Sequence, residues 1–286
     1  MSLLNSLPLT RIKIGIARVL YKGLPPSYRR GTHRITRGGI RYEVDLSEGI
    51  DLSLFLFGGF QRHVTRSRFA SIPADGVVFD VGANAGVMAL QFAKLVPPGH
   101  VYAFEPTHYA FARLRANLGL NPELAARITA IQTFVSASRD DRPAPQVFAS
   151  WKVDGSRSDG RHPVHLGTPV SAEGVGATTV DARAAEHGLS RLDFVKIDTD
   201  GHEMEVLKGA AETLKRFRPA VVFEIGLYVM QERGIGFSAY EEYFRSLGYR
   251  VLDSKTGREI TTANHHRIIP ARGTIDALAL PAPGRV

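Results

Sequence analysis

From residue 77 onward, short apolar runs alternate with amphipathic stretches, and this alternation constrains the fold more than any other feature of the sequence. Apolar runs of roughly four to eight residues predict buried strands, and the longer amphipathic stretches predict helices. The pattern is typical of βαβ units around a parallel sheet, so we predict a doubly wound, Rossmann-like α/β domain. Seven strands are expected at residues 77–81, 100–105, 128–135, 192–198, 220–225, 249–252 and 275–280, with helices at 86–95, 108–118, 181–187, 202–217 and 239–247.

The residues ahead of this pattern differ from it in charge and predict an N-terminal extension. Residues 1–72 hold 12 Lys and Arg against 4 Asp and Glu, whereas the rest of the chain holds 24 of each. Residues 3–22 predict a basic amphipathic helix, and residues 33–46 predict a hairpin around Gly38-Gly39. We prefer packing of this helix on its own domain to its lying on a membrane. A basic extension attracts phosphate, a glycolipid, an anionic membrane or an acidic glycan, with an ordinary solvated surface as the alternative.

Residues 73–286 are expected to form one domain, because a chain of this length can bury one substantial core. Residues 139–178 interrupt the alternation, since they are rich in Gly, Pro, Ser and Asp and too long for an ordinary connection. We expect a substrate loop here, with partial disorder as the alternative. Trp151 lies in this loop and either stacks on a sugar face or anchors the loop.

The composition excludes several classes of chemistry. The chain has no cysteine, which rules out disulfides, thiolate nucleophiles and cysteine-based zinc sites. It has no run of about 18 apolar residues, and its first residues do not read as a cleaved signal peptide. We therefore expect a cytoplasmic protein, with peripheral contact to a membrane through the basic extension as a further expectation.

A glycine turn follows the first expected strand, in Asp80-Val81-Gly82-Ala83-Asn84-Ala85-Gly86. Gly82 permits an unusual turn and Gly86 allows close helix packing, so backbone N–H groups can approach a ligand. A site for dinucleotide pyrophosphate would show G-x-G-x-x-G, but here the first glycine is missing and an acid precedes the turn. A carboxylate at Asp80 suits a cationic cofactor such as S-adenosylmethionine better than a pyrophosphate.

Glu105 closes the second expected strand, 19 residues after Gly86. This is the place where a carboxylate accepts hydrogen bonds from both ribose hydroxyls of a bound nucleoside. An acid here fits NAD as well, so Glu105 predicts a nucleoside cofactor without identifying it.

Ionisable side chains gather at the ends of the fourth and fifth expected strands. Glu224 ends the fifth strand among apolar residues, where a carboxylate is costly unless it faces a cleft, a partner or a metal. Because the carboxyl ends of parallel strands border the ligand crevice, we expect Asp198 and Glu224 to be near neighbours. The group at the fourth strand comprises Lys196, Asp198, Asp200, His202 and Glu203.

Together these segments resemble the FkbM family of methyltransferases over residues 77–280. The resemblance implies a seven-stranded methyltransferase sheet and methyl transfer from S-adenosylmethionine to a hydroxyl oxygen, commonly of a sugar, glycan or secondary metabolite. The family usually has Glu where Asp200 stands, and Glu is common where Gln61 stands. The resemblance is carried by the 80–86 turn, Tyr102-Ala103-Phe104-Glu105-Pro106, the segment from Val195 to Glu203, Val206-Leu207-Lys208-Gly209-Ala210 and Phe223-Glu224.

We expect His202 to be the general base, because its unperturbed pKa lies nearest neutrality, with Asp198 or Glu203 orienting it. Alternatively, His202 only caps a helix. In a second mechanism Asp198 and Glu224, with Asp200, hold Mg²⁺, but we favour S-adenosylmethionine without a metal. The catalytic residues are expected to be His202, Asp198 and Glu224, and the cofactor-binding residues Asp80, Gly82, Asn84, Gly86, Glu105, Ser136 and Asp198.

Three other functions stay open at this point. An NAD-dependent oxidoreductase of the Rossmann type is opposed by the missing first glycine and by Asp80. An RNA-binding methyltransferase is suggested by the basic extension. DNA is not an expected partner, since the chain lacks both an Asn/Asp-Pro-Pro-Tyr/Phe segment and a cysteine for attack on a pyrimidine. A catalytically idle binding module would bind cofactor without turnover.

Overall fold

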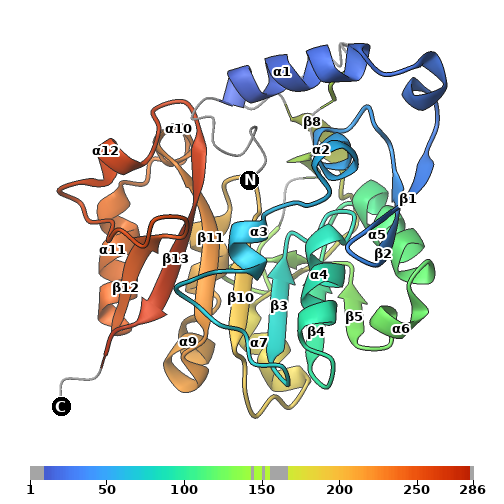
Figure 1. Cartoon of the computed structure of the whole chain (residues 1–286). Coiled ribbons are helices and arrows are strands. Elements are labelled where there is room, and N and C mark those ends of the chain that lie inside the picture. The colour runs from blue at the N-terminus through green and yellow to red at the C-terminus, as the bar shows by residue number, and fades with distance from the viewer. Residues whose placement is uncertain (1–9, 143–144, 150–151, 155–166, 284–286) are drawn as a thin grey trace.

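The computed structural model describes residues 10–142, 145–149, 152–154 and 167–283. At its centre lies a seven-stranded sheet in the order β12-β13-β11-β10-β3-β4-β5, with β13 antiparallel to both of its neighbours (Figure 1). All seven expected strands are confirmed, as is the doubly wound fold. Their bounds are β3 (Val77–Val81), β4 (His100–Phe104), β5 (Ile128–Ile131), β10 (Phe194–Ile197), β11 (Ala220–Gly226), β12 (Tyr249–Asp253) and β13 (Thr274–Pro281).

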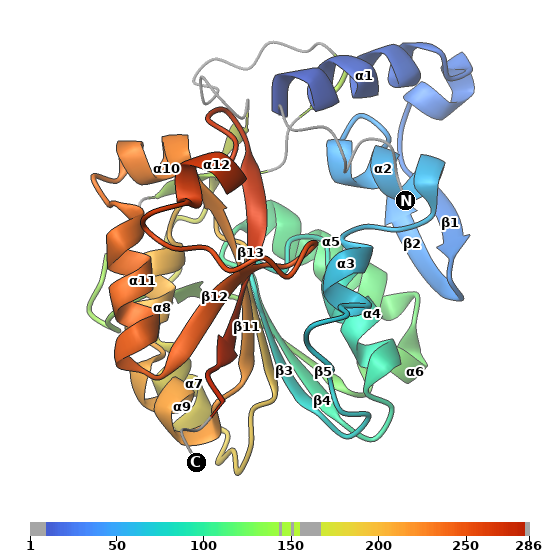
Figure 2. The ribbon, with the colours of Figure 1, turned by 60° about the vertical axis from the view of Figure 1, so that its left-hand side comes forward.

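Helices cover both faces of the sheet, as Figure 2 shows with the strands seen between the two helical layers. Alternate residues of β3 face opposite layers: Phe79 belongs to one hydrophobic cluster and Val78 to the other, and both are fully buried. Full burial of a side chain of this size contributes about 1.5–3 kcal/mol. One layer contains α4 (Val87–Leu95), α5 (His108–Gly119) and α6 (Pro122–Ala125). The other contains α7 (Val180–Glu186), α8 (Glu203–Lys208), α9 (Ala211–Phe217), α10 (Leu227–Glu232), α11 (Phe237–Ser246) and α12 (His265–Ile268).

Two expected elements are divided in the structure. The run 128–135 ends as a sheet strand at Ile131, and its last two residues form β6 (Phe134–Val135), which pairs with β9 (Ala177–Thr178). The expected helix 202–217 breaks between α8 and α9 at Gly209. A Cβ at Gly209 would lie 2.1 Å from the carbonyl oxygen of Ser136, so the backbone approaches too closely there for any side chain.

The N-terminal segment packs on the α4 side of the domain. The hairpin of β1 (His33–Arg37) and β2 (Ile40–Val44) is confirmed, and α1 (Thr10–Lys22) contacts α2 (Gly49–Phe57). Ala17 and Tyr21 of α1 are buried in the same hydrophobic cluster as residues of β3 and α4. The sequence did not predict α2, the short α3 (Arg62–Thr65) or the 3₁₀ turn (Pro26–Arg29).

Part of the long loop forms a hairpin of β7 (Gln146–Ala149) and β8 (Thr168–Ser171) and joins the N-terminal segment. The backbone N–H of Val153 donates to the carbonyl of Ser47 at 2.7 Å, and the backbones of Lys152 and Glu48 form an isolated antiparallel β-bridge. Trp151, with its two expected roles, lies outside the described residues. No helix in the described part of the chain is long and apolar enough to cross a membrane.

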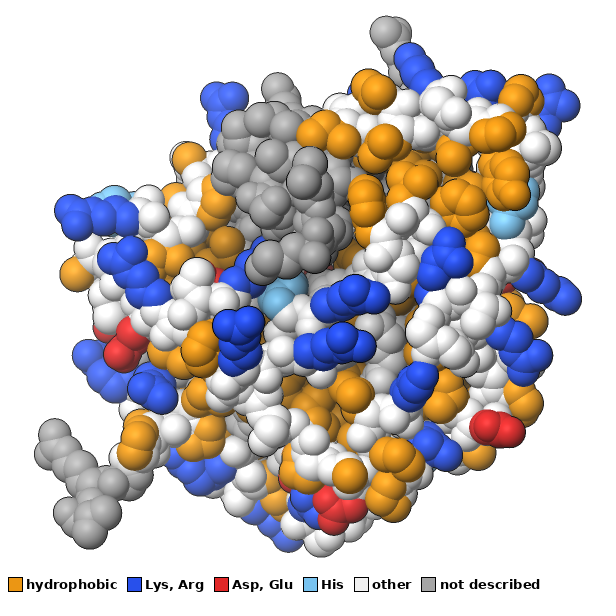
Figure 3. All heavy atoms as spheres, in the orientation of Figure 1, with side chains coloured by type: hydrophobic (Ala, Val, Ile, Leu, Met, Phe, Trp, Pro, Cys, Tyr) orange, Lys and Arg blue, Asp and Glu red, His pale blue; other side chains and the backbone are white. Residues whose placement is uncertain are grey.

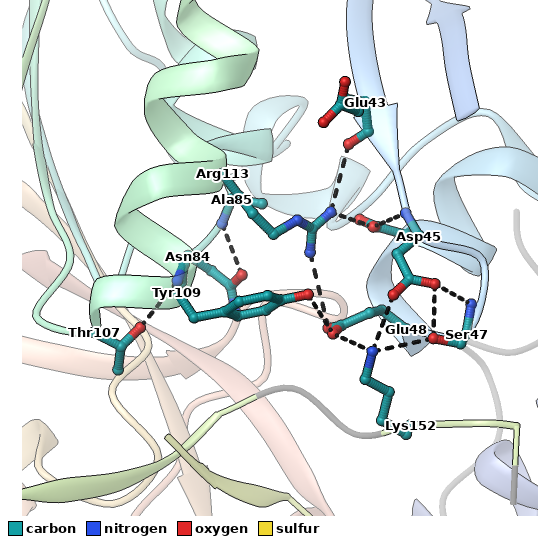
Figure 4. Close-up of polar contacts among 12 residues, drawn as sticks. Glu43, Asp45, Ser47, Glu48, Asn84, Ala85, Thr107, Tyr109, Arg113 and Lys152 are labelled. Atoms are coloured by element: carbon teal, nitrogen blue, oxygen red, sulfur yellow. Dashed lines mark hydrogen bonds and ion pairs between the residues drawn. The ribbon is translucent and has the colours of Figure 1, made fainter. Parts of the chain in front are cut away.

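A cluster of ion pairs links the long loop to the N-terminal segment (Figure 4). We call it the N-terminal network and define it by the carboxylates Asp45, Glu48 and Asp51 and the cations Arg113 and Lys152. Glu48 and Asp51 are each only 2% exposed. Lys152 Nζ lies 3.0 Å from Asp45 Oδ2 and 3.1 Å from Glu48 Oε1, and Arg113 forms an ion pair with Asp51. Since Arg113 belongs to α5, the network ties the segment and the loop to the helix that follows β4.

Candidate active site

A cavity of about 390 Å³ opens at the carboxyl ends of β3, β4 and β10. In open α/β sheets this edge is where ligands bind. The cavity is lined by Val81, Gly82, Asn84, Phe104, Glu105, Pro106, Thr107, Thr133, Phe134, Val135, Ser136, Ala137, Asp141, Arg142, Val147, Asp198, Thr199, Asp200, His202 and Glu205. Five of these side chains are carboxylates, and we call them the cavity acids: Glu105, Asp141, Asp198, Asp200 and Glu205. Among the described residues of this lining, Arg142 is the one Lys or Arg side chain.

The glycine turn forms the floor of the cavity at the end of β3. Gly82 has a φ of 78°, and a Cβ there would lie 1.8 Å from the carbonyl oxygen of Asp198, so only glycine fits. Gly86, with a φ of 79°, precedes α4 and packs against Leu114 of α5. Gly82 lines the cavity, whereas Gly86 lies behind it and allows close helix packing. Gly86, one of the expected cofactor contacts, therefore shapes the turn and lies outside the cavity lining.

Glu105 is held rigidly at the end of β4. Its Oε2 accepts a hydrogen bond from the backbone N–H of Asn84 at 2.9 Å, and its Oε1 accepts from the backbone N–H and hydroxyl of Thr107 at 2.9 and 2.6 Å. Burial raises the pKa of Glu105, and these hydrogen bonds act against that rise. Because Oε2 has one partner, it retains capacity to accept from a ligand hydroxyl.

Asp80 lies outside the cavity lining, in contrast to the direct cofactor contact expected from the sequence. In the register of the sheet, Asp80 of β3 stands opposite Lys196 of β10. The Asp80 side chain is 0% exposed, and its Oδ1 lies 3.4 Å from Lys196 Nζ. The same ammonium group lies 3.2 Å from Asp198 Oδ2. Asp80 therefore acts on the cavity from outside its lining, through the ion pair with Lys196 and through its charge, which raises the pKa of Glu105.

On its other side Asp198 joins a chain of contacts that reaches the N-terminal segment. Gln61 Nε2 donates to Asp198 Oδ2 at 3.2 Å and to Asp276 Oδ1 at 3.4 Å. Asp276 Oδ2 in turn lies 2.5 Å from His63 Nε2. No local pattern marks His63 or Asp276, because they stand 213 positions apart and meet only through the fold.

Glu224 lies outside the cavity lining and accepts a hydrogen bond from the Thr274 hydroxyl at 2.6 Å. Burial raises the pKa of Glu224 well above its usual value, and the charges of Asp198 and Asp200 raise it further. This mutual influence agrees with the expected proximity of Asp198 and Glu224. Asp200 faces the cavity, where desolvation and then the charges of Asp198 and Glu203 raise its pKa well above the ordinary range.

Glu203 organises the loop that follows β10. Its Oε1 accepts hydrogen bonds at 3.1 Å from the backbone N–H and the hydroxyl of Thr199 and from the backbone N–H of Gly201. The loop contains two residues with positive φ, Asp200 at 51° and Gly201 at 100°. Glu203 therefore stabilises an unusual turn that presents Asp200 to the cavity, and its bonded carboxylate oxygen is not directed at His202.

Arg233, rather than Asp198 or Glu203, positions the ring of His202. Arg233 Nη2 lies 2.9 Å from His202 Nε2, and since a guanidinium can only donate, Nε2 is the acceptor. Burial lowers the pKa of His202, and the charge of Arg233 lowers it further. His202 stands at the N-cap of α8 but makes no side-chain capping hydrogen bond. Its role as base stays a prediction, with the constraint that the Nε2 lone pair is already used.

Ser136 lines the cavity as expected, and its hydroxyl donates to Asp141 Oδ2 at 2.6 Å. The sequence reasoning did not single out Asp141 or Arg142 in the same wall. Across the described ranges, no group of three or more His, Asp and Glu side chains is arranged to hold a metal ion. The magnesium hypothesis for Asp198, Asp200 and Glu224 therefore gains no support from the geometry.

Comparison with known proteins identifies the family that this chain matches. A family model described as the Methyltransferase FkbM domain matches residues 80–251. The chain is 30% identical over 243 residues to the 31-O-demethyl-FK506 methyltransferase FkbM of Streptomyces tacrolimicus, and the alignment covers 74% of this chain and 90% of that protein.

Two further relatives are similar over a smaller part. The 2-O-methyltransferase NoeI of Sinorhizobium fredii is 30% identical over 155 residues, covering 50% of this chain. The hexuronic acid methyltransferase AglP of Haloferax volcanii is 27% identical over 165 residues, covering 57% of this chain. The matched part spans 61% of the length of each of these two proteins.

Proposed function

Since this chain belongs to the FkbM family of methyltransferases, we propose that it transfers the methyl group of S-adenosylmethionine to a hydroxyl oxygen of a sugar, glycan or secondary metabolite. The names of the relatives support this class of acceptor: one is a 2-O-methyltransferase, one a hexuronic acid methyltransferase and one a 31-O-demethyl-FK506 methyltransferase. Their acceptors differ from one another, so the chemistry is proposed here and the individual acceptor is left to experiment.

The observation that carries the proposal is the charge of the cavity lining. Among the described residues of the lining, the five cavity acids face a single Arg, Arg142, and Lys196 pairs with Asp198 from outside the lining. Carboxylates in a partly enclosed site stabilise a cation and repel a pyrophosphate, because the Coulomb interaction is strengthened at low dielectric. S-adenosylmethionine carries a positive sulfonium and a positive amino group, whereas the diphosphate of NAD is negative. The lining thus supports the methyl donor over the oxidoreductase alternative.

Each cofactor contact has a proposed role. The backbone around Gly82 and Asn84 and the carboxylate of Asp198 receive the amino-acid end of the nucleoside, and Glu105 Oε2 accepts from a ribose hydroxyl. Ser136, which follows β6, lies in the part of the cavity wall that we assign to the adenine base of the cofactor. Asp80 keeps Lys196 charged and in place, and thereby fixes Asp198.

When bound, S-adenosylmethionine supplies an electrophilic methyl group, so this chain needs to align the acceptor and move a proton. Alignment of two bound reactants can supply effective molarities of about 10⁵ M or more. Removal of the hydroxyl proton by a positioned base adds roughly 10²–10⁴ in rate. The absence of cysteine is no obstacle, since no covalent enzyme intermediate is required.

Calorimetry and an acceptor screen test the proposal. Titration of the full chain with S-adenosylmethionine and S-adenosylhomocysteine should give saturable heats, and NAD should give none. A panel of free sugars, uronic acids, nucleotide sugars and polyketides is then incubated with the enzyme and isotopically labelled methyl donor, and products are sought by mass spectrometry. Well-folded protein that binds neither sulfur nucleoside would falsify the proposal.

We also infer that the basic N-terminal segment contacts an anionic lipid surface. Residues 1–42 contain nine Lys and Arg and no Asp or Glu. In the described part of this segment Val19 is 71% exposed and Tyr28 is 42% exposed, beside the exposed Arg29 and Arg30. Figure 3 shows Lys and Arg side chains around apolar ones along the upper rim, over α1 and the turn that follows it. Basic groups near an anionic membrane contribute about 1 kcal/mol each, and interspersed apolar groups add to the binding.

Vesicle sedimentation tests this contact. The chain should sediment with phosphatidylserine vesicles and stay in solution with phosphatidylcholine vesicles, and Arg29→Glu with Arg30→Glu should weaken the binding. Equal sedimentation with both vesicle types would contradict it. RNA that co-purifies with the protein and competes with the vesicles would instead support the RNA-binding alternative.

A further inference from the structure

We propose that His63, held by Asp276, is the base that removes the proton from the acceptor hydroxyl. The inference rests on the proposed O-methyl transfer and names the residue that carries out its proton step. His63 comes from α3, near the start of the chain, and Asp276 from β13, near its end. Neither residue was a candidate at the level of the sequence.

The geometry of the pair fixes the state of the imidazole. His63 Nε2 lies 2.5 Å from Asp276 Oδ2, and the two side chains are 19% and 15% exposed. Burial opposes ionisation of Asp276, but the hydrogen bond and charge of His63, with Lys255 and Lys196, keep its pKa below the usual value. An ionised carboxylate can only accept, so Nε2 carries the ring proton. In neutral His63 the lone pair is therefore on Nδ1, which is the arrangement a general base needs.

The pair is joined to the cavity through Gln61. The Gln61 amide donates both to Asp276, which holds His63, and to Asp198, which lines the cavity. Figure 1 shows α3 at the upper edge of the sheet, beside the carboxyl ends of β3 and β10. His63 lies outside the lining of the cofactor cavity but at the same sheet edge, on the side of β10 that leads to β11 and β13.

The identity of Gln61 fits this assignment. An amide at this position can donate to two carboxylates at once, whereas the Glu expected from the family resemblance would place a third negative charge between Asp198 and Asp276. Gln61 also adopts a left-handed conformation with a φ of 42°, which costs a residue other than glycine roughly 1–2 kcal/mol. Val64 of α3 is buried in the hydrophobic cluster that contains residues of α4 and so anchors this short helix. The backbone is therefore held in a costly shape that places both Gln61 and His63.

His202 is the alternative candidate for the base, but its ring contacts a cation, whereas the ring of His63 contacts a carboxylate. Its Nε2 accepts from the cationic Arg233, so that lone pair is occupied and the proton of the neutral ring is on Nδ1. His202 must break a charge-assisted hydrogen bond before it can accept a proton at Nε2. His63 is partnered by a carboxylate, which stabilises the imidazolium formed when Nδ1 takes the proton.

The proton step balances without another reactant. The acceptor O–H bond breaks as its proton moves to His63 Nδ1, and the oxygen forms a bond to the methyl carbon. The S–CH₃ bond breaks with its electron pair staying on sulfur, which turns the positive sulfonium into a neutral thioether. The imidazolium then returns its proton to water.

Nitrogen NMR tests the assignment without a known acceptor. The protein is labelled with ¹⁵N-histidine, and the His63 signals are identified by their loss in His63→Gln. We expect a proton on Nε2 and none on Nδ1 at a pH where the ring is neutral. Exchanging S-adenosylhomocysteine for S-adenosylmethionine adds a positive charge near the reacting atoms, so the Nδ1 signal should move while that of His33, in the β1–β2 hairpin, should not. A proton on Nδ1, or a signal that is the same in both complexes, would overturn the proposal, whereas failure of both nucleosides to bind would overturn the proposed function instead.

Kinetics with an acceptor from the screen supply the second readout. His63→Gln should lower kcat by roughly 10²–10⁴ while the affinity for S-adenosylmethionine stays unchanged. Asp276 acts through His63 and is a positioning residue, so Asp276→Asn should lower kcat less and displace the pH dependence of kcat. His33→Gln serves as the matched control and should match the parent enzyme. A parental rate in His63→Gln together with slow turnover in His202→Gln would assign the base to His202.

Discussion

The N-terminal network and the cavity acids are both clusters of carboxylates, but they differ in their cation partners: cations contact all three acids of the former, whereas within the described residues only Asp198 of the latter forms an ion pair, with Lys196. Arg113 and Lys152 contact all three acids of the N-terminal network, and Tyr109 donates a further hydrogen bond to Glu48 (Figure 4). As far as the structure describes the lining, the five cavity acids share it with one Lys or Arg side chain, Arg142. A balanced cluster stabilises the fold, whereas an unbalanced one stores electrostatic free energy that a cationic ligand can release. The comparison separates a structural role from a binding role.

The largest expected effect is on stability, from Glu48→Ala in the N-terminal network. Removing one partner of a buried ion pair leaves the other charge uncompensated, so we expect a loss of about 3–5 kcal/mol in the free energy of unfolding. Denaturant melts would measure it, and calorimetry on the folded fraction should show unchanged affinity for S-adenosylmethionine. An equal loss of affinity and stability would break the distinction between the two clusters.

Glu105→Ala tests the cavity side of the comparison. Loss of a charge-assisted hydrogen bond to the ribose should weaken S-adenosylmethionine binding by about 100-fold, which corresponds to roughly 2.7 kcal/mol. Calorimetry measures the affinity directly. Glu205→Ala is the matched control, because it removes a carboxylate from the same lining without removing the ribose contact. Parental affinity in Glu105→Ala would show that the nucleoside is bound elsewhere.

The pH dependence of binding should be smaller but diagnostic. Desolvation and neighbouring carboxylates raise the pKa of Asp200 and Glu224, so each of these groups keeps its proton to a higher pH than an ordinary carboxyl does. A bound cation favours the ionised form, and affinity for S-adenosylmethionine should therefore rise severalfold from about pH 5 to pH 8. S-adenosylhomocysteine lacks the sulfonium charge and should show a shallower rise in the same titration. Parallel curves would mean that the cavity acids do not sense that charge.

The smallest effect is expected at Lys152, whose side chain is 27% exposed. Lys152→Ala should reduce the free energy of unfolding by about 1 kcal/mol or less, because solvent screens the pairs that it forms. Thermal melts of this variant beside Glu48→Ala would rank the two contributions. A loss as large as that of Glu48→Ala would indicate that the long loop is fastened chiefly through this lysine.

The parts of the fold that were predictable are those with a local cause. Seven largely apolar runs predict seven strands, because strands of a sheet that helices cover on both faces are buried on both sides. The break at Gly209 and the division of the run 128–135 depend on tertiary contacts: a close approach to Ser136 and a pairing with β9. Helices α2 and α3 are short and irregular in hydrophobic pattern, so no periodicity marks them.

The residues of the site likewise fall into those that the local sequence indicates and those that depend on tertiary contacts. Gly82 and Glu105 were identified because their requirements are local, a turn with positive φ and the end of a strand. The environment of Asp80 depends on which residue of β10 stands opposite, and the sequence does not specify that register. The pairing of His63 with Asp276 depends on the position of β13 in the sheet, which joins the two ends of the chain.

That position of β13 bears on how the protein is made. Strand β13 lies between β11 and β12, yet it follows both in the sequence. During synthesis the emerging chain can form the β3–β4–β5 half and the glycine turn early, while β11 keeps an unpaired edge until residues 274–281 leave the ribosome. Unpaired edges invite wrong partners, so the interval before this strand inserts is when the chain depends most on protection from aggregation.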